Sequence, residues 1–184
     1  SPASPPIPGI DSEGVLHCWT LKDARAIAKR AVKGARVLQM GAGFIGCIIM
    51  ESLAARGVQL TVVEMGDRMV PRMMGPTAGG MIKDWCETKG VRVFTGTRVE
   101  AIESGGKTAA PLKVRLSNGQ SLEADLVISA TGVKPNIGFL ETSGVKCLLG
   151  VLTDEHLQTN VAGVYAAGDC AEAFDKVSGK TIVS

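Results

Sequence analysis

The sequence predicts a three-layer α/β fold with a parallel sheet and an inserted antiparallel β-meander. Between residues 35 and 94, apolar runs alternate with helical runs, and this order produces parallel strands joined by helical crossovers. After Thr95 the apolar runs become short and are separated by turn residues, which is typical of antiparallel strands. A helix-covered parallel sheet is therefore expected to carry a small second sheet.

The central segment runs from residue 37 to residue 64. An apolar run enters the glycine-rich turn 41–46, and a helical run then extends to Gly57. A second apolar run, 58–63, closes on Glu64. This is the order strand, tight turn, helix, strand. Glu64 follows the first glycine at close to the ~20 residues expected for a carboxylate that binds an adenosine ribose. The alternative is a glycine turn that serves structure alone.

Dinucleotide binding explains each glycine of this turn. Gly41 allows a sharp turn, Gly43 leaves space for a pyrophosphate, and Gly46 lets the helix and strand pack closely. The helix dipole then places about half a positive charge beneath the phosphates. The segment is therefore predicted to be a Rossmann-like nucleotide-binding unit.

Electrostatics favours NAD(H) over NADP(H) for this unit. The phosphate of NADP would lie beside the carboxylate of Glu64, whereas a ribose diol donates hydrogen bonds to it. Arg68 offsets this preference in part, although a single arginine at that spacing is more often solvated or stacked on adenine.

Composition argues against several classes of function. The formal net charge is only +2, and few aromatic residues are present, so nucleic acid is not an expected partner. No uncharged apolar run approaches ~18 residues, so we expect no membrane span and a cytoplasmic protein. The five cysteines are scattered, which favours buried apolar roles over disulfides or a metal site.

The flanking elements follow from local patterns. Residues 1–11 are proline-rich and predict an extended connector. Thr20 to Asp23 resembles a capping box, and it opens a helix predicted to reach about Val32. The apolar stripe of this helix is expected to be Leu21, Ala24, Ile27, Ala28 and Ala31.

A second helix is expected beyond a predicted loop, 66–80. It runs to about Gly90, and a third strand, 91–94, follows it. The apolar face of this helix is expected to be Met81, Ile82, Trp85 and Cys86.

The second half of the chain predicts the meander and a return to the parallel sheet. The meander strands are 98–102, 112–116 and 122–127, separated by turns at 104–107 and at Asn118-Gly119. The sheet resumes at 125–130 and ends in a turn at 131–136, on the edge where such sheets bind ligands. A further strand, 161–167, is expected to end in a similar turn at 168–170, and the tail after Ala173 gives no signal.

Taken together, these motifs resemble the flavoprotein pyridine nucleotide-disulfide oxidoreductase family, in the branch with ferredoxin and rubredoxin reductases, nitrite reductase and NADH oxidases. The motifs are PPIPG (5–9), TLKDARAI (20–27), GAGFIG (41–46), VVE (62–64) with Arg68 and Pro71, ATGVKPN (130–136) and VYAAGD (164–169). In that family an FAD-binding and an NAD(P)-binding domain face each other.

The resemblance implies that this chain is a portion of a longer protein. Residues 35–147 would form the NAD-binding domain, while residues 1–34 and 148–184 would be two strips of the FAD-binding domain. The remaining FAD domain and an interface domain would be absent. No tightly held FAD is then expected in the chain alone.

The resemblance also implies the site residues. For NAD these are Gly41, Gly43, Phe44, Ile45, Gly46, Glu64, Arg68, Ala130, Thr131, Gly132 and Val133. For FAD they are Gly168 and Asp169, with Asp169 on the ribitol; a helix N-cap or turn aspartate is the alternative. Two positions depart from the family pattern, Ile48 in place of a glutamate near the nicotinamide and Met50 in place of a small residue.

The main hypothesis is transfer of hydride from NADH to FAD, with electrons passed onward to an acceptor such as an electron-carrier protein. This needs no catalytic side chain from the present residues, so His17 and His156 are interpreted as ordinary polar positions. One alternative is a Rossmann dehydrogenase that reduces a small substrate directly. Another is a nucleotide-binding module without turnover, and apolar surfaces facing absent domains would then favour a homo-oligomer.

Overall fold

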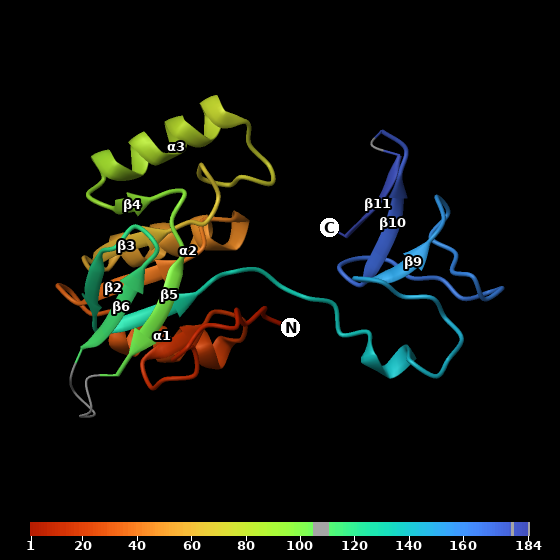
Figure 1. Ribbon diagram of the computed structural model, residues 1–184, viewed down its shortest axis with the longest axis horizontal. Helices are drawn as coiled ribbons and strands as arrows, with labels where there is room; N and C mark the ends of the chain where they lie inside the picture. Colours follow the sequence, from red (N-terminus) through yellow and green to blue (C-terminus); the bar gives the residue numbers. More distant parts are fainter. Residues whose placement is uncertain (105–110, 178, 184) are drawn as a thin grey trace. The chain divides into compact units, whose positions relative to one another are not determined.

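The computed structural model describes residues 1–104, 111–177 and 179–183. The chain forms two compact units, one of Pro2–Gly132 and one of Val133–Ser184 together with Ser1 (Figure 1). Among the described residues no helix is long and apolar enough to cross a membrane.

The first unit is built on a five-stranded parallel sheet with the order β1-β8-β2-β3-β4. The predicted parallel sheet is thus confirmed, including the return of the chain to it after the meander. Its strands are β1 (Val15–His17), β2 (Arg36–Met40), β3 (Gln59–Val63), β4 (Arg92–Phe94) and β8 (Leu126–Ser129).

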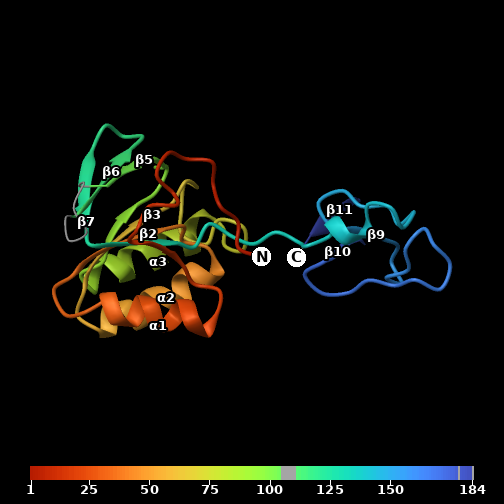
Figure 2. The ribbon, with the colours of Figure 1, turned by 90° about the horizontal axis from the view of Figure 1, so that it is seen from below.

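Two apolar clusters make this unit three-layered. Successive residues of β2 point to opposite faces of the sheet, so Val37 joins one cluster and Leu38 joins the other. The first cluster packs against helices α1 (Leu21–Arg30), α2 (Phe44–Ala55) and α3 (Pro76–Thr88). The second packs against the small sheet of β5 to β7, and Figure 2 shows the helices and this sheet on opposite sides of β2 and β3.

Helix α1 begins at the predicted capping box. The Asp23 N–H donates to Thr20 Oγ1 over 3.2 Å, and the Thr20 N–H donates to Asp23 Oδ2 over 2.8 Å. The bond from the Thr20 N–H lowers the pKa of the Asp23 carboxyl, and so does the Thr20 hydroxyl, which donates to the same carboxylate oxygen over 2.8 Å. The predicted stripe is only partly correct, because Ile27 is buried whereas Leu21 is exposed. Ala31, at the end of the helix, is also buried, so the second half of α1 packs on the sheet and its first turn does not.

Helix α3 begins earlier than predicted, so the loop expected over 66–80 is wrong in its last five positions. Pro76 occupies the first turn, where a missing N–H costs nothing. Gly79 lies inside the helix. The residue must be glycine, because a Cβ there would lie 2.7 Å from the Met69 carbonyl oxygen. This glycine permits close packing and does not break the helix.

The apolar face of α3 also differs from the prediction. Cys86 is buried and Ile82 packs against the helix-side core, but Met81 and Trp85 are exposed by 68% and 59%. Each residue along a helix turns the side chain by about 100°, so the 82/86 and 81/85 pairs form neighbouring stripes, and only the first faces the sheet. Lys89 lies over the Trp85 ring, 5.7 Å from its centroid.

The meander is confirmed as an antiparallel sheet of β5 (Val99–Glu103), β6 (Leu112–Leu116) and β7 (Ser121–Ala124). The turn at Asn118-Gly119 joins β6 to β7, with Gly119 at a positive φ of 81°. The other predicted turn, 104–107, lies mostly outside the described residues.

The proline-rich N-terminal segment has no helix, as expected, but it is not extended throughout, because residues 8–11 form a turn. The segment packs on the meander. Ile7 and Ile10 join the second apolar cluster, and the Ile102 N–H donates to the Pro8 carbonyl oxygen over 2.9 Å. A Cβ at Gly9 would lie 1.8 Å from the Ile102 carbonyl oxygen, so only glycine fits this contact.

Arg36, at the start of β2, links the meander to the parallel sheet through ion pairs. Its guanidinium binds Asp125 through Nε at 3.1 Å and Nη2 at 2.7 Å, and it also pairs with Glu123. The same pairing lowers the pKa of the Asp125 carboxyl. Since β2 begins at Arg36 and Asp125 lies between β7 and β8, the ion pair sets where the chain returns to the sheet.

The second unit contains a short helix, η1 (Gly138–Leu140), and a small mixed sheet. Its strands are β9 (Val151–Thr153), β10 (Ala171–Asp175) and β11 (Lys180–Val183), in the order β11-β10-β9. The tail after Ala173 therefore carries strand structure that its composition did not indicate.

The strand predicted over 161–167 is wrong. Gly163 adopts a positive φ of 78°, and within the described residues this segment has one isolated bridge, Gln158 to Tyr165, in place of a ladder. A strand requires a neighbour that completes its backbone hydrogen bonds. As a result, the turn 168–170 lies before strand β10 and not at the carboxyl end of a strand.

A buried carboxylate organises the second unit. Glu172 accepts hydrogen bonds from the Gly150 N–H, the Thr181 hydroxyl and the Leu149 N–H, each over 2.9 Å. These bonds, that of Gly150 foremost, hold the pKa of Glu172 below its ordinary value, against the opposite effect of burial. Strand β10 is thereby tied to β11 and to the segment that leads into β9.

We predict that Glu172→Gln reduces the acid sensitivity of this unit. Because the folded-state pKa of Glu172 is lowered, its contribution is complete above the unfolded pKa and is lost as pH falls through the folded pKa, from about pH 5 downward. The variant should be less stable at neutral pH and lose less stability on acidification. Urea titrations followed through the amide signals of β10 measure this.

Glu141→Gln removes an exposed carboxyl of the same unit and serves as the control. If the stability of wild type and Glu172→Gln fell in parallel between pH 6 and about pH 3, the role given to this carboxylate would be incorrect.

Candidate functional site

The glycine-rich turn lies at the carboxyl end of β2. Gly41 adopts a positive φ of 95°, and a Cβ there would lie 2.4 Å from the Ala130 carbonyl oxygen. Its N–H donates to the Val63 carbonyl oxygen over 2.8 Å. The turn is therefore held between the ends of the two neighbouring strands, β3 and β8.

Gly43 is the N-cap of α2. Its φ of −72° and ψ of −171° are extended backbone values, and no side chain caps the helix. A Cβ at Gly43 would meet no atom within 4 Å, so the space in front of the first turn is open. The amides that begin α2 thus face an open space, called the cradle below, which any side chain larger than that of Gly43 would enter. Free amides at the start of a helix are suited to bind a pyrophosphate. Phe44 and Ile45 form this first turn, and both side chains are exposed.

Gly46 closes the packing of α2 on the turn. A Cβ at this position would lie 2.5 Å from the Gly41 carbonyl oxygen and 3.0 Å from Gln39 Nε2. The third glycine therefore has the close-packing role expected from the sequence. Ile48 and Phe44 stay exposed on the outer side of the helix, whereas Met50 is buried beneath it.

Glu64 follows β3 and binds the turn directly. One carboxylate oxygen accepts the Ala42 N–H over 2.6 Å, and the other accepts the Gly66 N–H over 2.7 Å. The residue is only 8% exposed. A carboxylate oxygen can accept more than one hydrogen bond, so Glu64 can still accept ribose hydroxyls while it holds the turn.

Arg68 is engaged by its own loop. Its guanidinium donates to the carbonyl oxygens of Met74 and Pro71, over 2.7 and 3.1 Å, and it pairs with Asp67. These contacts shape the loop between β3 and α3. The structure therefore shows Arg68 as a loop-organising residue beside the predicted site.

The residues after β8 complete this edge of the sheet. The Ala130 N–H donates to the Met40 carbonyl oxygen over 2.8 Å, and Gly132 has a positive φ of 112°. The N-terminal segment crosses this exit: the Ala3 N–H donates to the Gly132 carbonyl oxygen, and Thr131 Oγ1 donates to the Ala3 carbonyl oxygen.

The structure thus brings most of the predicted NAD residues to one sheet edge. The glycine turn, Glu64 and the segment 130–132 all lie at the carboxyl ends of adjacent parallel strands. Val133, Gly168 and Asp169 belong to the other compact unit. There Gly168 has a positive φ of 79° and accepts the Ala171 N–H, and Asp169 is exposed.

Sequence reasoning missed two residues that support the turn. Gln39 lies fully buried in β2 behind the glycines, and Val70 contacts the turn from the loop after β3. Val70 has an unusual positive φ of 48°, and its N–H donates to the Ala42 carbonyl oxygen over 2.9 Å. A polar residue inside an apolar run was a signal for Gln39. Val70 gave none, because its strain follows from tertiary contacts.

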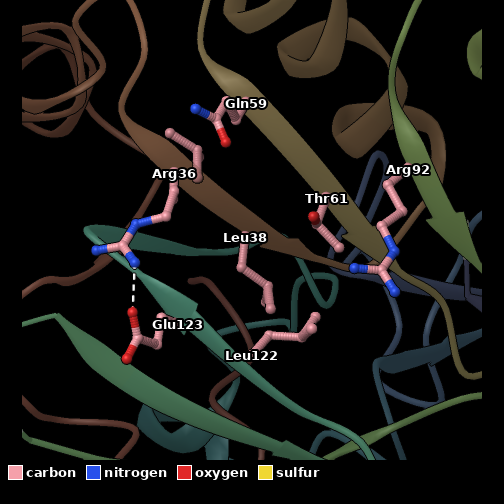
Figure 3. Close-up of a pocket in the computed structure, with 8 residues that line it drawn as sticks. Arg36, Leu38, Gln59, Thr61, Arg92, Leu122 and Glu123 are labelled. Carbon is pink, nitrogen blue, oxygen red and sulfur yellow. Dashed lines mark hydrogen bonds and ion pairs between the residues drawn. The ribbon is translucent and has the colours of Figure 1, made fainter.

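A separate crevice lies at the opposite edge of the sheet, where β2, β3 and β4 begin (Figure 3). Arg36, Gln59 and Arg92 form its rim, and Leu38 and Leu122 line its interior. Arg36 is paired with Asp125 and Glu123, and Arg92 lies over the Phe94 ring. None of the predicted site residues lines this crevice.

Comparison with known proteins places these features in a family context. The profile of the family described as pyridine nucleotide-disulphide oxidoreductase matches residues 1–182. The epsilon subunit of NADH-dependent phenylglyoxylate dehydrogenase from Aromatoleum evansii is 38% identical over 167 residues, which are 91% of this chain and 39% of that protein. The chain therefore spans about two fifths of the length of this curated relative.

Solved structures agree in fold. An NAD-dependent persulfide reductase from A. fulgidus matches all of this chain and 34% of its own, with 36% identity and a TM-score of 0.90. An engineered water-forming NADPH oxidase, a variant of the Lactobacillus brevis NADH oxidase, was solved with NADPH bound. It matches all of this chain and 40% of its own, with 25% identity and a TM-score of 0.86.

We predict that the first two glycines of the turn differ sharply in their effect on stability. Gly41→Ala places a Cβ against the Ala130 carbonyl at a positive φ, so it should lower the free energy of unfolding by about 2 kcal/mol or more. Gly43→Ala meets open space, so its effect should stay within about 1 kcal/mol. Urea denaturation of both variants provides the comparison, and equal losses would contradict the geometry described for the turn.

Proposed function

Because the chain belongs to the pyridine nucleotide-disulphide oxidoreductase family, we propose that its Pro2–Gly132 unit binds NADH and presents it for hydride transfer to a flavin. The observation that supports this most is the open cradle at Gly43, at the start of a helix that no side chain caps. Gly75 has the same open space at the start of α3, but only the Gly43 turn also has a buried carboxylate, Glu64, bonded to it.

The binding residues act through charge and shape. The amides that open α2 would receive the pyrophosphate, assisted by the positive end of the helix dipole. Glu64 would accept the hydroxyls of the adenosine ribose while it keeps Ala42 and Gly66 in place. When bound, NADH would supply a hydride for transfer to the flavin of the longer protein. No side chain of this chain needs to gain or lose a proton in such a transfer.

NAD(H) is proposed as the preferred coenzyme over NADP(H). Glu64 is buried at the end of β3, so a phosphate on the ribose would face a carboxylate with little solvent screening. Pro71 and Gly66 lie close to Glu64, because a Cβ at Gly66 would approach both Pro71 and Glu64. We therefore propose that this loop discriminates between NADH and NADPH.

The engineered NADPH oxidase gives independent support. Its substitutions replace a glycine, an aspartate, an alanine, a methionine and a proline, and the alanine and proline became arginine. Those positions follow one another at the same intervals as Gly46, Glu64, Met65, Gly66 and Pro71 of this chain. In that relative, loss of an acid and gain of arginines accompany binding of NADPH.

The proposal extends to a longer protein, because the chain spans only about two fifths of its curated relative. We propose that residues 148–184 contribute to an FAD-binding domain, with Gly168 and Asp169 near the flavin. Residues 2–34, expected from the sequence to belong to that domain as well, are part of the Pro2–Gly132 unit, because β1 pairs with β8 and Ile27 of α1 joins the helix-side core. Electrons would leave through the flavin to an acceptor, and an electron-carrier protein is the class we favour. The chain alone would then bind nucleotide without turnover.

We predict that Gly43→Val weakens NADH binding more than tenfold without unfolding the protein. The valine would enter the space proposed for the pyrophosphate, so affinity should fall more than tenfold while the melting temperature changes little. Gly75→Val is a matched control, since Gly75 is the N-cap of α3 with nearly the same backbone angles and the same open space. Calorimetric titration with NADH is the measurement, and full affinity in Gly43→Val would refute the proposed site.

We predict that the unmodified protein binds NADH at least tenfold more tightly than NADPH, which corresponds to about 1.4 kcal/mol. Repulsion between Glu64 and the additional phosphate is the reason, so Glu64→Gln should narrow the difference. Parallel titrations with the two coenzymes decide this. Equal affinities in the unmodified protein would disprove the role given to Glu64.

A further inference from the structure

Gln39 is a fully buried amide in the middle of the parallel sheet. Its neighbours in register on β3 and β8 are Val62 and Ile128, both fully buried apolar residues. It lies on the same face of β2 as Val37, which is the face that packs against the helices. An amide at such a position opposes folding unless its polar atoms are bonded.

The amide nitrogen of Gln39 bridges the two ends of the glycine turn. Nε2 donates to the Gly41 carbonyl oxygen over 2.9 Å and to the Gly46 carbonyl oxygen over 3.0 Å. The partners fix the orientation of the amide, because a reversed amide would set its oxygen against two carbonyl oxygens. Both hydrogens of the NH₂ group are therefore used on this turn.

The other half of the amide has no matching partner. Gln39 Oε1 is buried and accepts no hydrogen bond from the described residues. An apolar side chain of similar size would avoid this unsatisfied acceptor. The amide is thus a poor choice for core stability alone, and what it provides in return is the connection between Gly41 and Gly46.

We propose that Gln39 is a positioning residue for the dinucleotide, an inference that rests on the function proposed above. The carbonyls it joins flank Gly43, Phe44 and Ile45, whose amides would face the pyrophosphate. One side chain that holds both flanks fixes the spacing between the turn and the first turn of α2. The donors are then aligned before the coenzyme arrives, so less ordering is required on binding.

Gln39→Met tests this inference, because methionine keeps the length of the side chain and removes its hydrogen bonds. We expect the dissociation constant for NADH to rise at least fivefold, while the melting temperature stays within about 3 °C of the unmodified protein. Gln59→Met is the control for the same substitution elsewhere in the sheet. Gln59 lies at the exposed start of β3, where its Nε2 donates to the Gly34 carbonyl oxygen over 3.3 Å, so this variant loses one exposed hydrogen bond far from the turn.

NMR gives a second readout that does not need the coenzyme. In the unmodified protein the Gln39 side-chain NH₂ signals should exchange slowly, and in Gln39→Met the amide signals of Gly43 to Ile45 should broaden. A variant that binds NADH normally, or whose turn amides stay sharp, overturns the inference. A variant that melts far earlier yet binds normally shows a purely structural role and also overturns it.

Failure of the proposed function has a different signature. If the unmodified protein does not bind NADH but the turn amides still broaden in Gln39→Met, the proposed function is refuted while the alignment of the turn by Gln39 is supported.

Discussion

The backbone of Ala42 is the point on which the proposed nucleotide-binding edge depends. Its N–H donates to the buried carboxylate of Glu64, and its carbonyl oxygen accepts the N–H of Val70. The glycine turn after β2 and the loop after β3 are therefore joined at a single residue. Val70 is held at a positive φ that β-branched residues rarely adopt, so the surrounding contacts must outweigh its strain.

This connection links coenzyme choice to phosphate binding. Glu64, the residue expected to distinguish NADH from NADPH, is also the acceptor for two backbone amides. Replacement of this carboxylate would release those donors as well as remove the charge. A change of coenzyme therefore requires compensation nearby, and the engineered oxidase does combine loss of its acid with several further substitutions. In the proposed function, one carboxylate would therefore serve both coenzyme discrimination and alignment of the turn.

The sequence predicted the parts of the fold that local chemistry determines. The capping box at Thr20, the Asn118-Gly119 turn and the strand–turn–helix at Gly41 all formed where residue types indicated. Errors occurred where tertiary contacts decide. Gly79, which resembles a loop glycine in the sequence, lies within a helix and permits the close approach of the Met69 carbonyl oxygen. The apolar run 161–167 lacks a neighbouring strand among the described residues.

The candidate site was predictable to a similar degree. Gly41, Gly46 and Glu64 follow a spacing that pyrophosphate and ribose recognition require, so their positions could be read directly from the sequence. The contacts of the residues that stabilise them could not, although Gln39 stands out as a polar residue inside an apolar run. Gln39 lies behind the turn only because β2 directs it toward α2, and Val70 reaches Ala42 only because the loop after β3 folds back. Both depend on contacts between separate elements.

A crystal structure of the protein with bound NADH would show where the dinucleotide lies. We predict the pyrophosphate against the amides of Phe44 and Ile45, with a ribose hydroxyl on Glu64 and the contacts of Ala42 unchanged. NADH bound elsewhere, for example in the crevice at the amino ends of β2 to β4, with the cradle at Gly43 left empty, would contradict this prediction.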